Sequence, residues 1–292
     1  MNGHTQLKDT SMRRAISTVV VALVAFGSPM ASQLGERPDP TTDTVKFAVI
    51  GDNGTGKRPQ HDVAQQMMAA RGAFPFEFVI MLGDNLYGSQ DVVSKFERPY
   101  AQLLQAGVLF YAALGNHDSP ANRSYKGFNM NGDRYYSFAK KNVRFFVFDT
   151  NLMDRTQVAW IDDTLGRTQE AWKIAYFHHP LYSDGRRHGS NLQLRVVLEP
   201  LLVKHGVDVV FSGHEHFYQR TTPQKGITYF VEGSSGQLRK GNVRPTAMTA
   251  AAYDQDQTFM LVEVVGPRLS FRTISRAGRS VDSGEIHLQT ES

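Results

Sequence analysis

Five short polar fragments, each placed directly after an apolar run, constrain the fold of this 292-residue chain more than any other feature. The runs span residues 45–50, 76–82, 108–114, 172–177 and 207–211. They are short, rich in β-branched or aromatic residues, and bounded by Gly, Asp, Asn or Pro, which is typical of strands covered on both faces. In α/β proteins the loops after the carboxyl ends of the strands form the binding crevice. We therefore expect one edge of the sheet to carry all five fragments: Gly51-Asp52-Asn53-Gly54, Gly83-Asp84-Asn85-Leu86-Tyr87, Gly115-Asn116-His117-Asp118, His178-His179-Pro180 and Gly213-His214-Glu215-His216.

Helical patterns alternate with the strand-like runs and predict an α/β fold. A further strand is expected at residues 143–148, and the helical candidates are residues 60–70, 92–105, 156–165 and 191–204. The last third of the chain differs, because apolar runs at 227–231, 259–265 and 269–274 follow one another without a convincing helix. This pattern predicts antiparallel strands that close a second sheet.

Composition narrows the class of protein. An apolar content of 41% in 292 residues is enough for a full core, and we predict one domain over residues 45–290. Of the formal charge of +4, the first 32 residues hold +2, so the rest of the chain is close to neutral and has no polybasic run. The sequence therefore offers no nucleic-acid-binding feature and no attraction to an anionic membrane. Because the chain has no cysteine, disulfides and thiolate ligation are excluded.

The beginning of the chain has the pattern of a targeting segment. Arg13 and Arg14 precede an apolar stretch at 15–26, which small and helix-breaking residues then close. At about 12 residues the stretch is short for a bilayer, which needs roughly 20. We expect residues 1–32 to form a secretory signal peptide or, as the alternative, an uncleaved anchor, and residues 33–44 to form a linker. The expected location is periplasmic or secreted.

The five fragments supply ligands suited to two metal ions. Two cations about 3.5 to 4 Å apart require an anionic bridge, and a carboxylate directly after a strand is rigid enough to provide one. Asp84 is the candidate bridge. A second carboxylate, a neutral carbonyl oxygen and three imidazoles complete the donor set: Asp52, Asn116, His178, His214 and His216. In an extended segment residues two apart face the same side, so both histidines of the fifth fragment can face the site.

Each fragment also has a simpler interpretation when it is taken alone. Gly-Asp-Asn is a common turn sequence, because Asp and Asn tolerate the left-handed region and bond to their own backbone. Turn chemistry does not explain why all five fragments occur in this order, each after a strand. Their joint occurrence favours the two-metal interpretation.

With Tyr87 three positions after Asp84, the ordered set resembles the calcineurin-like metallophosphoesterase superfamily. Within it, the closest resemblance is to the purple acid phosphatases of the small, tartrate-resistant type. The resemblance extends from Val45 to Ile286. It implies a four-layer αββα sandwich, in which two mixed sheets are flanked by helices, and a binuclear centre of Fe(III) with divalent Fe, Zn or Mn.

The resemblance also implies how the ligands are divided between the metals. Asp52, Tyr87, His216 and the shared Asp84 would hold the trivalent ion, and Asp84, Asn116, His178 and His214 the divalent ion. A phenol of pKa about 10 ionises at neutral pH only beside a strong Lewis acid, which a trivalent ion is. In the alternative, Tyr87 is a rim aromatic, and the protein is a dimetal phosphoesterase without the purple chromophore.

Two further histidines match positions around the metals in this family. His117 resembles the residue that contacts the phosphate and protonates the leaving alkoxide, and His188 resembles a substrate-contacting histidine. Asp118 is expected to orient His117 through a hydrogen bond. The alternatives are a turn-stabilising role for His117 and an ordinary loop position for His188. Asn53 and His179 stand where animal enzymes of this type have Trp and Tyr, so substrate preference does not transfer.

The resemblance implies a phosphatase. It would hydrolyse phosphate monoesters by in-line attack of a metal-bound hydroxide, with an acid pH optimum. The alternatives are a phosphodiesterase of the same superfamily and a non-catalytic metal- or phosphoester-binding protein. The expected partner is a small phosphorylated substrate, and the expected oligomeric state is a monomer.

Overall fold

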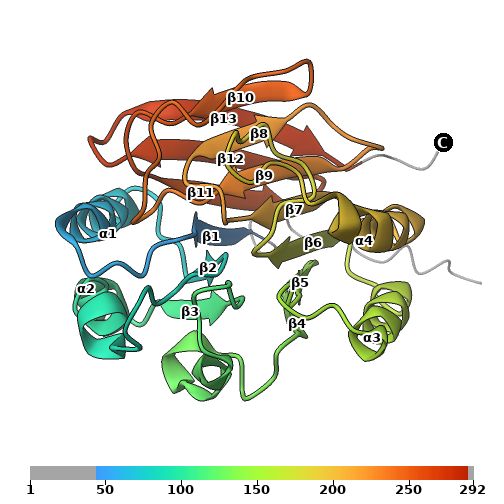
Figure 1. Ribbon diagram of the computed structural model, residues 1–292, viewed down its shortest axis with the longest axis horizontal. Helices are drawn as coiled ribbons and strands as arrows, with labels where there is room; N and C mark the ends of the chain where they lie inside the picture. The colour runs from blue at the N-terminus through green and yellow to red at the C-terminus, as the bar shows by residue number, and fades with distance from the viewer. Residues whose placement is uncertain (1–43, 289–292) are drawn as a thin grey trace, which may run out of the picture. The chain divides into compact units, whose positions relative to one another are not determined.

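The computed structural model describes residues 44–288, which form two mixed β-sheets packed face to face (Figure 1). The first sheet has the strand order β13-β12-β11-β1-β2-β3, and the second has the order β10-β8-β9-β7-β6-β5-β4. The expected signal peptide or anchor at 1–32 and the linker up to residue 43 lie outside the described residues.

The strands of the first sheet are β1 (Val45–Ile50), β2 (Phe78–Met81), β3 (Leu109–Ala112), β11 (Thr258–Val265), β12 (Arg268–Ser275) and β13 (Ser280–His287). Those of the second sheet are β4 (Tyr136–Lys140), β5 (Val143–Val147), β6 (Trp172–Phe177), β7 (Val209–Ser212), β8 (Tyr218–Thr221), β9 (Thr228–Glu232) and β10 (Thr249–Tyr253).

Each sheet contains a set of neighbouring parallel strands. β1, β2 and β3 are parallel to one another in the first sheet, and β5, β6, β7 and β9 are parallel in the second. Antiparallel strands extend both sheets, since β11 pairs with β1, β8 with β9, and β4 with β5. Parallel strands end in the same direction, so the loops that follow them meet at one edge.

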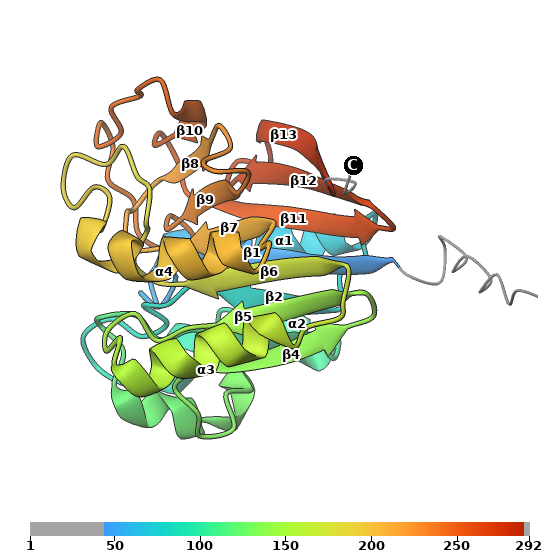
Figure 2. The same cartoon turned by 90° about the vertical axis from the view of Figure 1, so that its right-hand side faces the viewer.

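Helices cover the outer faces of both sheets, as Figures 1 and 2 show. Side chains of α1 (Arg58–Arg71) and α2 (Ala101–Gln105) share a buried cluster with β1 and β2, and those of α3 (Arg155–Gly166) and α4 (Leu192–Lys204) share another with β5 and β6. Alternate residues of β1 divide between two clusters. Phe47 and Val49 face the other sheet, whereas Ala48 and Ile50 face the helices. The expected four-layer αββα sandwich is confirmed.

Aromatic side chains fill the space between the two sheets. The ring of Phe47 on β1 lies 5.4 Å from that of Phe78 in its own sheet, and 5.2 Å and 6.3 Å from those of Phe145 and Phe211 in the other. All four side chains are buried. Edge-to-face contacts of this kind add to the free energy gained from burial. They fix how the two sheets sit on each other, and therefore where the ends of their strands meet.

The last third of the chain differs from the sequence prediction. The runs at 259–265 and 269–274 do not close a second sheet. As β11 and β12 they extend the first sheet, because β11 pairs with β1 in an antiparallel register that begins at Val45 and Val264. The run at 227–231 becomes β9, which is parallel to β7 in the second sheet. Local patterning identified the strands but did not reveal their long-range partners.

The predicted helix at 92–105 is interrupted. A π-helix spans Val93–Glu97, and α2 begins only at Ala101. Pro99 lies between them, and its ring and missing N–H prevent a continuous helix. Two short 3₁₀ turns follow the third polar fragment, at Pro120–Ser124 and Lys126–Phe128. None of the helices between residues 44 and 288 combines the length and apolar character that a membrane span requires.

The aromatic layer between the sheets should dominate the stability of the fold. Replacing Phe47 by Ala removes a fully buried ring that contacts both sheets, and should lower the free energy of unfolding by about 3 to 5 kcal/mol. Urea unfolding followed by circular dichroism measures this change. Leu152→Ala is the control, because Leu152 is 56% exposed and its loss should cost at most about 0.5 kcal/mol. Equal losses in the two variants would contradict the role given to this layer.

Candidate metal centre

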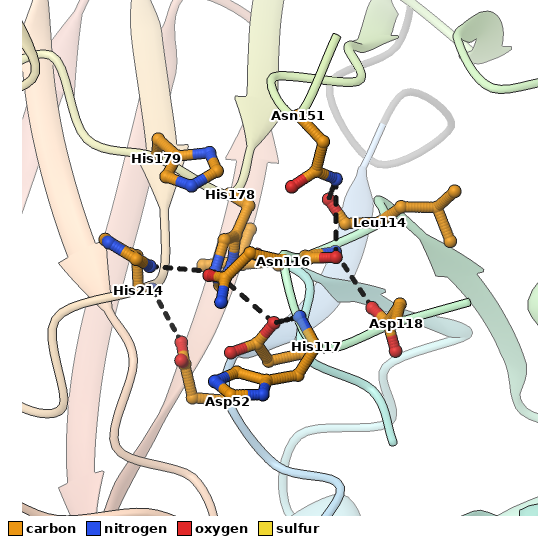
Figure 3. A network of polar contacts seen from close by, with 12 residues as sticks. Asp52, Leu114, Asn116, His117, Asp118, Asn151, His178, His179 and His214 are labelled. Carbon is orange, nitrogen blue, oxygen red and sulfur yellow. Dashed lines mark hydrogen bonds and ion pairs between the residues drawn. The ribbon is translucent and has the colours of Figure 1, made fainter. Parts of the chain in front are cut away.

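All five polar fragments lie together, at the edge where the parallel strands of both sheets end. The first three follow β1, β2 and β3 of one sheet, and the last two follow β6 and β7 of the other. Backbone hydrogen bonds join neighbouring fragments, from Asp52 N to Gly83 O (3.0 Å) and from Gly213 N to His178 O (3.0 Å). Figure 3 shows the side chains that converge there. The predicted convergence on one edge is confirmed.

The backbone at this edge is shaped so that the side chains can approach one another closely. A Cβ on Gly115 would lie 2.1 Å from Asp84 Oδ1, and one on Gly83 would lie 2.6 Å from His178 Nδ1, so both positions require glycine. Asp52, Asp84 and His214 adopt left-handed backbone conformations, with φ of 51°, 54° and 70°. Such conformations cost of order 1 to 3 kcal/mol each and persist where the surrounding structure holds them. The two aspartates are thus both turn residues and candidate ligands.

One group of donor atoms surrounds Nε2 of His178. Asn116 Oδ1 lies 3.0 Å from it, His214 Nδ1 3.1 Å and Asp84 Oδ1 3.4 Å. The other ring nitrogen, Nδ1, donates to the carbonyl of Leu82 (2.9 Å), so Nε2 carries a lone pair. A carboxylate oxygen and an amide oxygen close to two imidazole nitrogens form a donor set that fits a divalent transition metal.

A second group of donors surrounds Oδ1 of Asp52. The hydroxyl of Tyr87 donates to this oxygen (2.8 Å), and His216 Nε2 lies 3.3 Å from it and 3.2 Å from the hydroxyl. The other oxygen, Oδ2, accepts from the backbone N–H of His214 (2.7 Å). Burial, and then the charge of Asp84, raise the pKa of Asp52 well above its ordinary value. A cation at this point would stabilise the ionised forms of both Asp52 and Asp84. The donor set therefore fits a hard metal ion.

Asp84 lies between the two groups. Its carboxylate is close to His178 in one group, and one ligand atom each from Asp52, Asp84 and His178 lie within 4.8 Å of one another. Asp84 is buried, and its Oδ1 accepts the backbone N–H of His117 (2.9 Å). This position fits the bridging role expected from the sequence.

Burial disfavours the charged form of the three histidines in the two donor groups, because it lowers the pKa of each. Burial, and then the neighbouring His178, lower the pKa of His214 to about 2, and burial followed by Arg239 lowers the pKa of His216 to about 4. Burial also lowers the pKa of His178 well below its ordinary range. Neutral imidazoles keep the lone pairs that metal binding needs.

The fifth fragment brings both of its histidines to the site, but not by the expected route. His214 contacts His178 and His216 contacts Tyr87, so both do face the donors. The fragment is a bend and not an extended segment, because His214 has a left-handed backbone. Glu215 lies between the two histidines in the sequence, and its side chain points away from the donor groups, toward His188 and Asn242.

The expectation that Asp118 orients His117 through a hydrogen bond is wrong. The Asp118 carboxylate accepts instead from the backbone N–H groups of Gly115 (2.8 Å), Asn85 (3.1 Å) and Leu86 (2.9 Å), so it joins the second and third fragments. Within residues 44–288 it makes no hydrogen bond to the His117 ring. His117 lies against Tyr87 instead, with ring centroids 4.7 Å apart, and its side chain is exposed. The backbone amides, which had no place in the sequence argument, determine where Asp118 points.

Two more histidines gather around His214. The ring of His188 lies 4.2 Å from that of His214, and the ring of His179 lies 4.5 Å from it. His179 Nδ1 contacts Thr150 Oγ1 (2.9 Å), whereas Nε2 of His178 faces Asp84 and Asn116. The nitrogen of His179 also lies within 4.8 Å of those of His178 and His214. Proximity to Asp84 favours His178 over His179 as the ligand.

Comparison with known proteins agrees with this geometry. The family model described as Calcineurin-like phosphoesterase matches residues 45–218, which include all five fragments up to His216.

The chain belongs to the calcineurin-like phosphoesterase family.

Curated relatives of this phosphoesterase are acid phosphatases, that is, hydrolases that act on phosphoric ester bonds. Tartrate-resistant acid phosphatase type 5 of Oryctolagus cuniculus is 28% identical over 242 residues, which cover 66% of this chain and 73% of the rabbit protein. The predicted resemblance to purple and tartrate-resistant acid phosphatases is confirmed.

Solved structures share the fold. GAP50, described as the anchor in the inner membrane complex of Plasmodium, matches with a TM-score of 0.71 and 18% identity over 85% of this chain and 90% of its own. The purple acid phosphatase PPD1 from yellow lupin (Lupinus luteus) matches with a TM-score of 0.70 and 20% identity over 84% of this chain and 54% of its own.

Sequence reasoning missed the role of Glu215 in this phosphoesterase. Its buried carboxylate accepts the backbone N–H groups of His188 (2.9 Å) and Gly189 (2.7 Å) through Oε1, and the side chain of Asn242 (2.8 Å) through Oε2. It therefore ties the loop that carries His188 to the fifth fragment. An acidic residue between two candidate ligands was the available signal, but its partners lie 26 to 27 residues away.

Replacing Glu215 by Gln should loosen the loop at 185–190. One of the two oxygens becomes an NH₂ group, which cannot accept the amide hydrogens, and hydrogen bonds to a charged group contribute roughly 1.5 to 3 kcal/mol. Amide hydrogen exchange should therefore accelerate at His188 and Gly189 more than in the strands. Glu285→Gln is the control, since that carboxylate lies in an exposed ion pair with Arg268. Unchanged exchange at both amides would contradict the anchoring role.

Proposed function

We propose that this protein is a dimetal phosphatase of the purple acid phosphatase type, which hydrolyses phosphate monoesters and is most active in acid. The observation that carries the proposal is the pair of donor groups that share Asp84 at the edge where both sheets end. Oxygen and nitrogen donors in this arrangement are what two-metal phosphoester hydrolysis requires. The acid-phosphatase names of the curated relatives support the reaction and its pH range.

We assign the two donor groups to different ions. The group with Tyr87 would hold Fe(III) through Asp52, Tyr87, His216 and Asp84, and the other would hold divalent Fe, Zn or Mn through Asp84, Asn116, His178 and His214. Burial and the charges of Asp52 and Asp84 raise the pKa of Tyr87 well above its ordinary value, so the phenol ionises here only beside a strong Lewis acid. When bound, the ions supply an activated water and neutralise charge on the phosphoryl group.

The chain's own residues would position the ester and supply a proton. His117 is exposed beside Tyr87, and its backbone N–H holds the bridging carboxylate of Asp84. We assign to its side chain the contact with the phosphate and the proton for the leaving alkoxide. His188, held against His214, would contact the substrate from the opposite loop. Asp118 would act indirectly, by fixing the loops that carry Asp84 and Asn116.

A phosphodiesterase and a non-catalytic binding protein are the two alternatives to the proposed phosphatase. A phosphodiesterase of the same superfamily would need the same metals, and a non-catalytic binding protein would need only the fold. The likeness to GAP50 shows that the fold alone does not decide between enzyme and anchor. The complete donor set favours an enzyme.

We further propose that the catalytic domain spans residues 45–290 and acts as a monomer on small phosphorylated substrates. The Arg13-Arg14 pair and the apolar stretch after it support export, either as a cleaved signal peptide or as an anchor. The protein would then act in the periplasm or outside the cell.

The Fe(III) assignment predicts a colour that depends on Tyr87. Purified with iron present and without chelators, the protein should show a visible absorption band from tyrosinate-to-iron charge transfer. Tyr87→Phe should lose the band while iron, measured by plasma emission, stays above half of the wild-type amount, because the other donors remain. Tyr125→Phe is the control, since its hydroxyl bonds to Glu97 away from the site. A colourless wild-type protein that holds zinc or manganese would refute the iron assignment and leave the phosphoesterase intact.

The preference for monoesters predicts a ratio of rates. At acid pH, kcat/KM for p-nitrophenyl phosphate should exceed that for bis(p-nitrophenyl) phosphate by at least about tenfold, a difference that corresponds to about 1.4 kcal/mol. Chelation of the metals should abolish both activities, and Asp84→Ala should do the same with loss of bound metal. The reverse ratio would identify a phosphodiesterase, and metal binding without any turnover would identify a binding protein.

A further inference from the structure

A cavity of about 450 Å³ opens directly beside the metal centre. It lies between the loop at 187–190 and the start of α4, and its lining includes His179, His188 and His214. His214 belongs to both places, because its Nδ1 lies 3.1 Å from Nε2 of the candidate ligand His178. Figure 3 shows His179 and His214 on the same side of the donor groups. A substrate whose phosphoryl group sits at the metals therefore has this cavity next to it.

The lining of the cavity is mainly polar, with Pro180 and Leu192 as its apolar side chains, and it contains no acidic residue. Apart from the three histidines, Arg187 is the one ionisable residue among its described lining residues, and the others include Asn191 and Gln193. The side chain of Arg187 is exposed and makes no ion pair or hydrogen bond within residues 44–288. Its guanidinium is thus available for an anion that enters the cavity.

The buried carboxylate behind this loop makes no ion pair with Arg187 within residues 44–288. Glu215 is fully buried behind the loop, and both of its oxygens already accept hydrogen bonds from His188, Gly189 and Asn242. It also has its own cation, because Arg239 Nη1 lies 3.8 Å from Oε2. The cavity therefore presents an unpaired positive charge.

We propose that this cavity holds the leaving group of the substrate, and that through Arg187 it selects phosphate esters whose leaving group carries a second anionic group, a carboxylate or a phosphate. This inference rests on the proposed phosphatase function. The Arg187 guanidinium would repel a cationic leaving group, because no acidic residue lines the cavity to offset the repulsion.

The neighbouring arginine provides a matched control. Arg186 is also exposed and makes no side-chain ion pair within the described part of the chain, but it lines a different hollow, with Asp184 and Arg244. Its backbone is paired with the loop at 242–244. Arg186→Gln and Arg187→Gln therefore remove the same charge from adjacent positions, and only the second removes it from the cavity.

The test uses four esters built on one two-carbon skeleton. Hydroxyethyl phosphate has a neutral leaving group, phosphoglycolate adds a carboxylate, ethylene glycol bisphosphate adds a phosphate, and phosphoethanolamine adds a cation. With the metal-loaded wild type, kcat/KM for at least one anionic ester should exceed that for hydroxyethyl phosphate by about tenfold, as a charge-assisted contact implies. Phosphoethanolamine should be the poorest substrate. The two anionic arms identify whether a carboxylate or a phosphate is preferred.

Arg187→Gln should reduce the anionic preference to about twofold or less, whereas Arg186→Gln should retain it. Equal losses in both variants would overturn the inference, because they would indicate a general electrostatic field and not a subsite. A wild type that hydrolyses all four esters equally would also overturn it, while the phosphatase function stands. If no ester is hydrolysed, the proposed function fails, and isothermal titration calorimetry with the same esters then decides the inference from the ratio of Kd values in the wild type and the two variants.

Discussion

Packing of the two sheets through their aromatic inner faces is the constraint on which the site depends. Phe47 and Phe78 of one sheet interlock with Phe145 and Phe211 of the other, and this fixes the distance and angle between the sheets. The loops that follow these strands therefore approach the common edge from both sheets. Neither sheet alone carries a complete donor set, since the carboxylates follow strands of the first sheet and three of the histidines follow strands of the second. The packing of the core therefore determines how the donor residues of the two sheets are placed relative to one another.

The local backbone at that edge shows how one sequence can form both a turn and a candidate metal site. The motif glycines leave room for side chains to approach, and the aspartates adopt the left-handed conformations that Asp tolerates better than most residues. Hydrogen bonds from backbone amides then hold each carboxylate in place: His214 N to Asp52, His117 N to Asp84, and three amides to Asp118. The residue that makes a good turn is also the residue that makes a good ligand, so the two interpretations of Gly-Asp-Asn are not alternatives in this structure.

The strands that carry the five fragments, and the convergence of those fragments on one edge, could be predicted because their signals are local. The strands β4, β8, β10 and β13 were not predicted. An apolar run closed by Gly-Asp or Gly-His identifies both the strand and its polar end, and a known family supplies the order. The pairing of β11 with β1 could not be predicted, because it joins residues as far apart in the sequence as Val45 and Val264 and leaves no local pattern. The orientation of Asp118 was missed for a related reason, since it depends on amides of the loop at 85–86. The break before α2 could have been predicted, because Pro99 was visible in the sequence.

Glu215 separates the two histidines of the last fragment and holds the loop that borders the cavity. His214 belongs to one donor group and His216 to the other, so a single buried carboxylate lies between both candidate ion sites and beside the cavity. A leaving group that presses on the loop at 187–190 would act on this carboxylate. Any displacement of this loop would be transmitted through the Glu215 carboxylate to the backbone that carries His214 and His216.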